Sequence, residues 1–311
     1  MDPAVMLAGV TKTFGSQRAV DQLDLRIPRG ALCGVIGPNG AGKTTTIRIL
    51  MSILFPDSGQ VSVLGHASAL AAKDRIGYLP EERGVYRKMK VIDFLVYMAG
   101  LKAVPESQAR PWLLKSLERL ELTASAGKRC EELSRGMQQK VQFLASTLHR
   151  PDLLILDEPF SGLDPVSTRL LRQLVLEEHQ RGATILFSTH VMSHAEDLCD
   201  TVVMIHRGRK VLDESVAAIR RKFDVRSLLF EPLDPQADTK SLRTLPGVDD
   251  VSSNEGQMRV ALAPGTDPAA AIAAITAVIP TARIELARLR LEDVFIRLVD
   301  PTNQGSGAVT V

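Results

Sequence analysis

The segment GPNGAGKT at residues 37–44 is suited to binding a polyphosphate. Glycines let backbone N–H groups turn inward onto phosphate oxygens, and a lysine reaches the β- and γ-phosphates. The pattern G-x-x-x-x-G-K-[ST] is completed by Thr44, whose hydroxyl is suited to ligating Mg²⁺, and it lies between a predicted strand and a predicted helix. The predicted nucleotide-binding residues are Gly37, Pro38, Asn39, Gly40, Ala41, Gly42, Lys43, Thr44 and Thr45.

A pair of acids, Asp157 and Glu158, ends the apolar run LLILDE. Such a run is typical of a buried strand, so Asp157 is predicted at its end, where a carboxylate can hold Mg²⁺ directly or through water. Glu158 can orient and deprotonate a water molecule aimed at the γ-phosphate. Kinases and GTPases share the glycine-rich loop, but this pair favours hydrolysis over transfer to a second substrate. Two ordinary surface acids are the weaker interpretation, because Mg²⁺ needs such a group.

A second anion site is predicted from LSRGMQQK at residues 133–140. The small residues Ser134 and Gly136 precede a run, MQQKVQFLASTL, that favours a helix, and the free N–H groups of a helix start bind anions. One chain therefore carries two candidate phosphate sites.

Composition narrows the class of protein. The 311 residues are enough for a main domain and a smaller second one. Lys and Arg number 38 and Asp and Glu 36, so the net charge of +2 does not favour nucleic acid as a partner. Three scattered cysteines indicate a reducing compartment, and we expect a cytoplasmic protein. The N-terminus lacks the basic region of a signal peptide, and no apolar run reaches the roughly 18 residues of a membrane span.

Hydrophobic patterning predicts an α/β fold. Residues 4–36 contain three strand-like runs, and a helix is expected from Thr44 to Phe55, followed by strands at QVSVLG and RIGYLP. Apolar spacings of three and four between 91 and 130, in VIDFLVYMAGLK and PWLLKSLERLEL, indicate an inserted helical subdomain at about 85–150. Beyond it, LLILDEP, TILFSTH and TVVMIHRGRKVLDE alternate with helical runs, as a mainly parallel sheet requires.

The pattern changes after about Lys222. Residues 223–300 read as strand, helix, strand, strand, helix, strand and a closing helix, which predicts a small α+β domain of the ferredoxin-like βαββαβ plan. Asp267 and Pro268 are suited to cap and open its second helix. The small polar residues at 301–311 predict a flexible tail.

These motifs, in this order, make the chain similar to the nucleotide-binding subunit of ATP-binding cassette (ABC) transporters over about residues 4–220. The resemblance implies a P-loop NTPase cassette at 1–222 with a mainly parallel core sheet, an antiparallel β subdomain and an inserted helical subdomain. LSRGM stands where the family has LSGGQ, with Arg135 and Met137 in place of the usual Gly and Gln. Family members pair head to tail, so Ser134 and Gly136 are expected to contact ATP held by the partner subunit's Lys43 loop.

Other roles follow from the same resemblance. Glu158 is expected to be the catalytic base, and His190 in STH matches a histidine that hydrogen-bonds the γ-phosphate and positions water. Asp164 in SGLD is expected to communicate between the two ATP sites. Phe14 in KTFG lies where the family places an aromatic under adenine, although a single aromatic among strands can equally belong to the core. The implied substrate is ATP and the implied cofactor is Mg²⁺.

The segment YLPEERG departs from the family pattern. Glu81 occupies the position of a Gln that ligates Mg²⁺ and links the site to the helical subdomain. A carboxylate is also a good hard ligand, so Thr44, Glu81 and Asp157 are the expected metal ligands. This segment, LSRGMQQKVQF and the appended C-terminal domain resemble the ATPases of type-2 ABC exporters, including those proposed for sodium or drug efflux.

The implied partners are a second copy of the chain and a separate transmembrane permease, which would hold the protein on the cytoplasmic face of the membrane. A basic loop at 82–91, with Arg83, Arg87, Lys88 and Lys90, is a docking surface, a contact for lipid headgroups or a solvated loop. Two other functions stay open at this point: an ABC-type ATPase acting on ribosomes or DNA, and a nucleotide-gated binding module with little hydrolysis.

Overall fold

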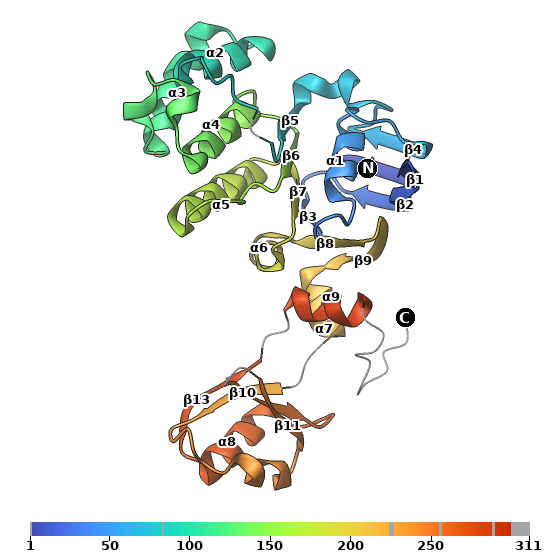
Figure 1. Cartoon of the computed structure of the whole chain (residues 1–311), viewed down its shortest axis with the longest axis vertical. Helices are drawn as coiled ribbons and strands as arrows, with labels where there is room; N and C mark the ends of the chain where they lie inside the picture. Colours follow the sequence, from blue (N-terminus) through green and yellow to red (C-terminus); the bar gives the residue numbers. More distant parts are fainter. Residues whose placement is uncertain (1, 83, 224–226, 255–256, 288–289, 300–311) are drawn as a thin grey trace. The chain divides into compact units, whose positions relative to one another are not determined.

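The computed structural model describes residues 2–82, 84–223, 227–254, 257–287 and 290–299. These residues form two compact units (Figure 1). Unit 1 extends to Val216 and also includes the chain from Phe295, and unit 2 extends from Ala217 to Val294. The predicted tail at 301–311 lies outside the described residues. Among those described, no helix is long and apolar enough to cross a membrane.

A six-stranded sheet forms the centre of unit 1, in the order β5-β6-β7-β3-β8-β9. All neighbouring strands are parallel except β8 and β9. The parallel strands are nearly continuous apolar runs, and every residue of β6 is buried, because helices cover both faces of such a sheet. The strands are β3 (Leu32–Ile36), β5 (Ile76–Leu79), β6 (Leu153–Asp157), β7 (Thr184–Thr189), β8 (Thr201–His206) and β9 (Arg209–Ser215).

The last two strands of this sheet form an antiparallel hairpin. Arg207 and Gly208 have φ values of 49° and 79°, the left-handed conformation at both central positions of a two-residue turn. The run TVVMIHRGRKVLDE is therefore two strands.

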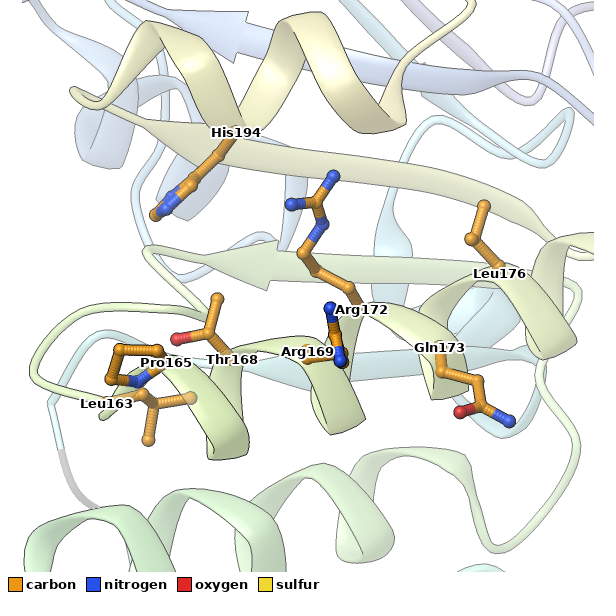
Figure 2. A pocket seen from close by; sticks show the side chains of 8 residues that line it. All are labelled: Leu163, Pro165, Thr168, Arg169, Arg172, Gln173, Leu176 and His194. Atoms are coloured by element: carbon orange, nitrogen blue, oxygen red, sulfur yellow. The ribbon is translucent and has the colours of Figure 1, made fainter.

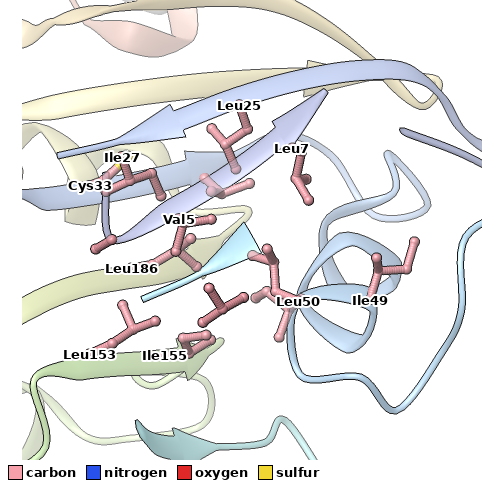
Figure 3. Packing of buried hydrophobic residues seen from close by; sticks show 14 of the residues in the cluster. Val5, Leu7, Leu25, Ile27, Cys33, Ile49, Leu50, Leu153, Ile155 and Leu186 are labelled. Carbon is pink, nitrogen blue, oxygen red and sulfur yellow. The ribbon is translucent and has the colours of Figure 1, made fainter. Parts of the chain in front are cut away.

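A three-stranded antiparallel sheet packs beside the central sheet in the order β2-β1-β4, with β1 (Val5–Phe14), β2 (Gln17–Ile27) and β4 (Ser58–Val63). Helix α1 (Lys43–Leu50) lies between the two sheets, and its Ile47 and Leu50 are fully buried (Figures 1 and 3). Side chains from both sheets and α1 make one core cluster. On the other face of the central sheet lie α5 (Pro165–Gln180) and α6 (Met192–Leu198).

Helix α1 is shorter than predicted. The helix was expected to continue to Phe55, but Ser52 adopts φ 56° and the N–H groups of Ile53 and Leu54 both donate to the carbonyl of Arg48. These two hydrogen bonds and the conformation of Ser52 end the helix several residues before Pro56. A 3₁₀ segment, η1 (Ala69–Arg75), then leads into β5 and was not predicted.

The helical subdomain is confirmed as α2 (Val91–Leu101), α3 (Glu106–Arg119) and α4 (Arg135–Thr147), with two short 3₁₀ turns, η2 (Thr123–Ser125) and η3 (Cys130–Glu132). Helix α3 begins at Glu106, before the apolar run PWLLKSLERLEL, and contains Pro111.

Unit 2 contains a four-stranded antiparallel sheet in the order β11-β12-β10-β13. This order interleaves two strand–helix–strand segments, as the ferredoxin-like plan does. The first helix of that plan is a 3₁₀ helix, η4 (Thr239–Thr244), and the second is α8 (Pro268–Val278), which Asp267 caps by accepting from the N–H of Ala269. The strands are β10 (Ser227–Pro232), β11 (Val248–Asn254), β12 (Gln257–Leu262) and β13 (Thr281–Leu286).

Unit 2 has its own apolar core, which includes Leu228, Phe230, Val260 and Ile275. Helices α7 (Val216–Lys222) and α9 (Leu291–Val299) stand at the two chain crossings between the units. Helix α7 was not predicted.

His149 joins the helical subdomain to the central sheet. It follows α4, and its Nε2 lies 3.0 Å from the carbonyl oxygen of Ile76, the first residue of β5. The Lys102 ammonium, at the end of α2, donates to the same carbonyl at 3.1 Å. Burial, and secondarily the Lys102 charge, lower the pKa of His149 from 6.5 to about 4. The junction therefore requires a neutral imidazole.

We expect this histidine to make stability depend on pH. Its folded pKa lies below the ordinary value, so the unfolded chain takes up the proton first and stability falls as pH decreases from about 6.5 towards 4. His149→Gln, which keeps an N–H donor, should flatten this part of the profile of urea midpoint against pH. The exposed His66 gives the control His66→Gln. Parallel profiles for wild type and His149→Gln would contradict the expectation.

Candidate functional site

Two glycines shape the loop between β3 and α1, and they occupy positions where no other residue type fits. Gly37 and Gly42 have φ values of 154° and 108°, and a Cβ atom at these positions would lie 2.2 Å from the carbonyl oxygen of Ile205 and 2.4 Å from that of Ala19. The loop therefore passes directly against neighbouring backbone, and its conformation is fixed before a ligand arrives. Gly42 also precedes the first residue of α1, so the free N–H groups of the helix start point out of the same loop.

The Lys43 ammonium is folded into this loop. It donates to the carbonyl oxygens of Gly37 and Pro38 at 2.7 and 3.1 Å and lies 3.8 Å from Glu158 Oε1. The side chain is only 6 % exposed. Burial lowers the pKa of Lys43, and the carboxylates of Glu158, Asp157 and Glu81 oppose that shift. A cation that is already desolvated and held among acids is well placed to bind phosphate oxygens.

Asp157 ends β6 as predicted and is almost completely buried. Its Oδ1 accepts a hydrogen bond from the Ser188 hydroxyl and lies 3.4 Å from Thr44 Oγ1. Its Oδ2 has no hydrogen-bond partner. Burial raises the pKa of this carboxyl, and its hydrogen bonds oppose the shift.

These residues fit a magnesium ion. A buried carboxylate with an unpartnered oxygen, next to a threonine hydroxyl, is a hard oxygen donor set. Within the described residues no group of three or more His, Cys, Asp or Glu side chains could hold a metal alone. Mg²⁺ is commonly bound by one or two carboxylates together with substrate phosphates, and this donor set is of that kind.

Glu158 and His190 are brought together at the carboxyl ends of β6 and β7. Glu158 Oε1 lies 2.9 Å from His190 Nδ1, so the imidazole donates Nδ1–H to the carboxylate and its Nε2 is left for another contact. Glu158 has φ 50°, and its N–H lies 3.2 Å from the carbonyl and 3.1 Å from the hydroxyl of Ser188. This left-handed conformation carries the side chain from the strand end towards Lys43.

A cleft of about 400 Å³ lies over Lys43 and Glu158. Asn39, Gly40, Gly42, Lys43, Thr44, Thr45, Glu81 and Glu158 line it, together with Phe14, Gln17 and Ala19. Phe14 is 48 % exposed, so it belongs to the cleft wall and not to the core. The loop residues Gly37, Pro38 and Ala41 shape the turn beneath, where the Ala41 N–H donates to the Pro38 carbonyl.

The predicted second anion site lies elsewhere in the chain. Ser134 is the N-cap of α4 and accepts from the N–H of Met137, and neither it nor Gly136 lines the Lys43 cleft. Arg135 is exposed at the first position of α4. Asp164 caps α5 by accepting from the N–H of Ser167 at 2.9 Å, and this hydrogen bond lowers the pKa of its carboxyl. Within one chain the two phosphate sites are therefore separate.

Sequence reasoning missed Ser188. Its hydroxyl contacts both Asp157 and the N–H of Glu158, and it holds this position because Asp157 and Ser188 are partners in the β6–β7 register. The triplet STH predicts a hydroxyl side chain near the end of its strand. The pairing of β6 with β7 is needed to show that this hydroxyl contacts Asp157. Gln17 and Ala19 were also missed as cleft residues.

A second cavity, of about 700 Å³, lies between α5 and α6 (Figure 2). His194 approaches it from α6, while Thr168, Arg169 and Arg172 approach it from α5. Arg172 is paired with Asp197 at 3.2 Å. None of the predicted nucleotide-binding, metal or catalytic residues lines this cavity.

Comparison with known proteins agrees with this geometry. The profile of the ABC transporter family matches residues 20–161. An uncharacterized ABC transporter ATP-binding protein, YhaQ of Bacillus subtilis, is 45% identical over 77% of this chain and 79% of its own length. The daunorubicin resistance ATP-binding protein DrrA3 of Streptomyces coeruleorubidus is 30% identical over 96% of each chain. A solved structure of an ATP-binding subunit of an ABC transporter matches with a TM-score of 0.66 and 30% identity, over 72% of this chain and 94% of that one.

The chain therefore belongs to the ABC transporter family and is one of its ATP-binding subunits. The resemblance and the cassette fold expected from the motifs are confirmed. Membership identifies an ATP-binding domain of the kind that hydrolyses ATP and works with separate membrane permease components. The alternative of an ATPase acting on ribosomes or DNA is not supported.

We expect Ser188→Ala to weaken the site without removing a group that touches substrate. The change leaves buried Asp157 without its hydroxyl donor, and an unsatisfied buried group costs about 1–3 kcal/mol. ATPase activity should fall about tenfold if about 1.36 kcal/mol of this cost is lost from the stabilisation of the transition state, because that amount corresponds to a factor of ten in rate. Thermal unfolding and steady-state kinetics measure both effects. The exposed Ser107 of α3 gives the control Ser107→Ala, and equal behaviour of the two variants would contradict the prediction.

Proposed function

We propose that the chain is the Mg²⁺-dependent ATPase motor of an exporter. In this proposal two copies act as a head-to-tail homodimer bound to a separate permease on the cytoplasmic face of the membrane. The observation that carries the proposal is the position of Glu158 Oε1, which lies 2.9 Å from His190 Nδ1 and 3.8 Å from Lys43 Nζ. An acid between a phosphate-binding cation and a histidine is arranged for hydrolysis.

Exporter relatives support the direction of transport. DrrA3 carries a daunorubicin resistance name, and the bacitracin transport protein BcrA of Bacillus licheniformis is 36% identical over 69% of this chain and 70% of its own length. These names concern daunorubicin resistance and bacitracin transport, and a Nod factor export ATP-binding protein of Paraburkholderia xenovorans is 34% identical over 70% of this chain and 73% of its own length. We propose export for this chain on that likeness, without assigning its cargo.

The mechanism follows from the chain's own residues. Lys43 exchanges its loop carbonyl partners for β- and γ-phosphate oxygens, and the N–H groups of residues 40–45 surround the phosphates. The Glu158 carboxylate accepts a proton from the attacking water. His190, oriented by its Nδ1–H bond to Glu158, keeps Nε2 as an acceptor, which takes a hydrogen bond from that water and holds it in line with the γ-phosphate.

The proposed magnesium ligands are Thr44, Asp157 and Glu81. When bound, Mg²⁺ neutralises charge on the phosphate oxygens. Asp157 supplies a buried carboxylate, Thr44 supplies a hydroxyl, and Glu81 lines the same cleft, so that a third oxygen donor is available from the β5 side. Because Glu81 is a carboxylate, the site holds one more negative charge than an amide would give it.

The head-to-tail dimer explains why the two anion sites are separate. Ser134 is exposed at the N-terminus of α4 and does not reach the cleft of its own chain. In the proposed dimer, Ser134 and Gly136 of one copy close over ATP in the other, and Asp164 lies between the two sites. ATP then joins the copies through charge-assisted hydrogen bonds, and hydrolysis releases them.

The remaining parts have proposed supporting roles. Arg87, Lys88 and Lys90 are exposed on the loop before α2, and we propose this loop as the permease docking surface. Arg83 belongs to the same prediction but lies outside the described residues. We propose that residues 223–300 form an accessory domain. The match with DrrA3 covers 96% of this chain and therefore extends into these residues.

Glu158→Gln is expected to abolish hydrolysis and preserve ATP binding. Removing a general base costs about 10²- to 10⁴-fold in rate, while an amide keeps the size of the side chain. Phosphate release and equilibrium ATP binding measure the two effects, each with and without Mg²⁺. The exposed Glu118 provides the control Glu118→Gln. Wild-type turnover in Glu158→Gln would refute the proposed mechanism.

The Glu158→Gln protein should dimerise when ATP and Mg²⁺ are added, because the bound nucleotide is not consumed. Adding Ser134→Arg should keep it monomeric, because the larger side chain blocks the turn that closes over the partner's ATP. Light scattering after size exclusion gives the mass of each species. Ser107→Arg, at an exposed position of α3, is the matched control. A Ser134→Arg dimer would contradict the head-to-tail arrangement.

A further inference from the structure

The aromatic wall of the cleft has a cation beside it. Phe14 is the last residue of β1 and lines the cleft, and the ammonium of Lys12 lies over its ring at 5.6 Å from the centroid. The contact between ammonium and ring places the two side chains next to each other at the end of the strand. At this distance the positive charge is attracted by the electron-rich ring face.

Asp57 fixes the position of this cation. Its Oδ1 accepts from Lys12 Nζ at 2.8 Å, and its Oδ2 accepts from the N–H of Thr13 at 2.7 Å. Its own N–H donates to the Thr11 carbonyl at 2.8 Å. The bond with Lys12, followed by that with Thr13, lowers the pKa of the Asp57 carboxyl. The Lys12 side chain is only 19% exposed, so its ammonium is part of the structure and not a mobile surface group.

The cleft and the Asp57 partner of Lys12 lie on different sides of β1. The cleft is lined by Gln17 and Ala19 of β2, on one side of β1, whereas Asp57 precedes β4, on the other side. Lys12 does not line the cleft. The register of β1 against β2 also shifts between Lys12 and Thr13, an irregularity that turns the strand end.

We propose that Lys12, held by Asp57, is a positioning residue for the nucleobase: its ammonium occupies one face of the Phe14 ring so that the other face is presented to the purine. This inference rests on the proposed role of Phe14 as the adenine platform. A ring whose π electrons are drawn towards a cation stacks more strongly on an electron-rich base, and a fixed ring loses less entropy on binding. Lys12 therefore contributes to affinity for the base and not to the hydrolytic step.

The test is a double-mutant cycle on Lys12 and Phe14. Lys12→Met should raise the KM for ATP about two- to fivefold, the size of an exposed cation–π contact, with kcat unchanged. Phe14→Ala should raise KM by about fivefold or more, because it removes base stacking. In the Phe14→Ala protein, adding Lys12→Met should change KM no further.

Three further measurements separate this role from the others. Inorganic tripolyphosphate has no base, so its calorimetric Kd should be the same in wild type, Lys12→Met and Phe14→Ala. Lys12→Arg, which keeps a cation able to lie on an aromatic face, should restore the KM of wild type. Lys115→Met, at an exposed position of α3, is the control for loss of a lysine.

Each alternative outcome overturns the inference. A Lys12→Met effect that persists in Phe14→Ala would show a direct contact between Lys12 and the base. An equal loss of kcat and of tripolyphosphate binding would show a general structural role. Normal ATP binding with an unchanged KM in Lys12→Met would overturn this inference alone, whereas a wild-type chain that did not bind ATP would overturn the proposed function and this inference together.

Discussion

The site depends on the burial of one carboxylate, that of Asp157, at the carboxyl end of β6. Desolvation opposes its charge, and only the Ser188 hydroxyl and the nearby Thr44 hydroxyl compensate for lost water. Among the described residues the second oxygen is left without a hydrogen-bond partner, so the folded chain holds an unsatisfied buried acceptor at this strand end. The same β6–β7 pairing that supplies Ser188 also fixes the backbone of Glu158 and the place of His190.

The parallel sheet brings these groups together because its strands end at one edge. β3 delivers the phosphate loop, β6 the two acids and β7 the histidine, although β3 precedes the other two strands by more than a hundred residues in the chain. The described residues that line the cleft all belong to unit 1, and unit 2 has its own core.

Residue types and spacing predicted the chemistry better than they predicted boundaries. GPNGAGKT and LLILDE carry local signals that depend on a single loop and a single strand, and both acquired the expected context. Ser188 was missed because its role depends on register between two strands, which sequence does not contain. The short α1 was missed because its end is set by Ser52 in a left-handed conformation, and η4 is 3₁₀ because its run spans only six residues. The separation of Ser134 from Lys43 likewise required the fold.

The hydrogen bonds that Lys43 makes to Gly37 and Pro38 have a consequence for nucleotide entry. The two carbonyls, with Glu158 3.8 Å away, give the buried ammonium partners within its own chain. Arrival of the triphosphate exchanges one set of acceptors for another, and the enthalpy of that exchange is smaller than that of forming new bonds. The net gain from Lys43 on binding is therefore the difference between phosphate and carbonyl oxygens as acceptors for the same ammonium.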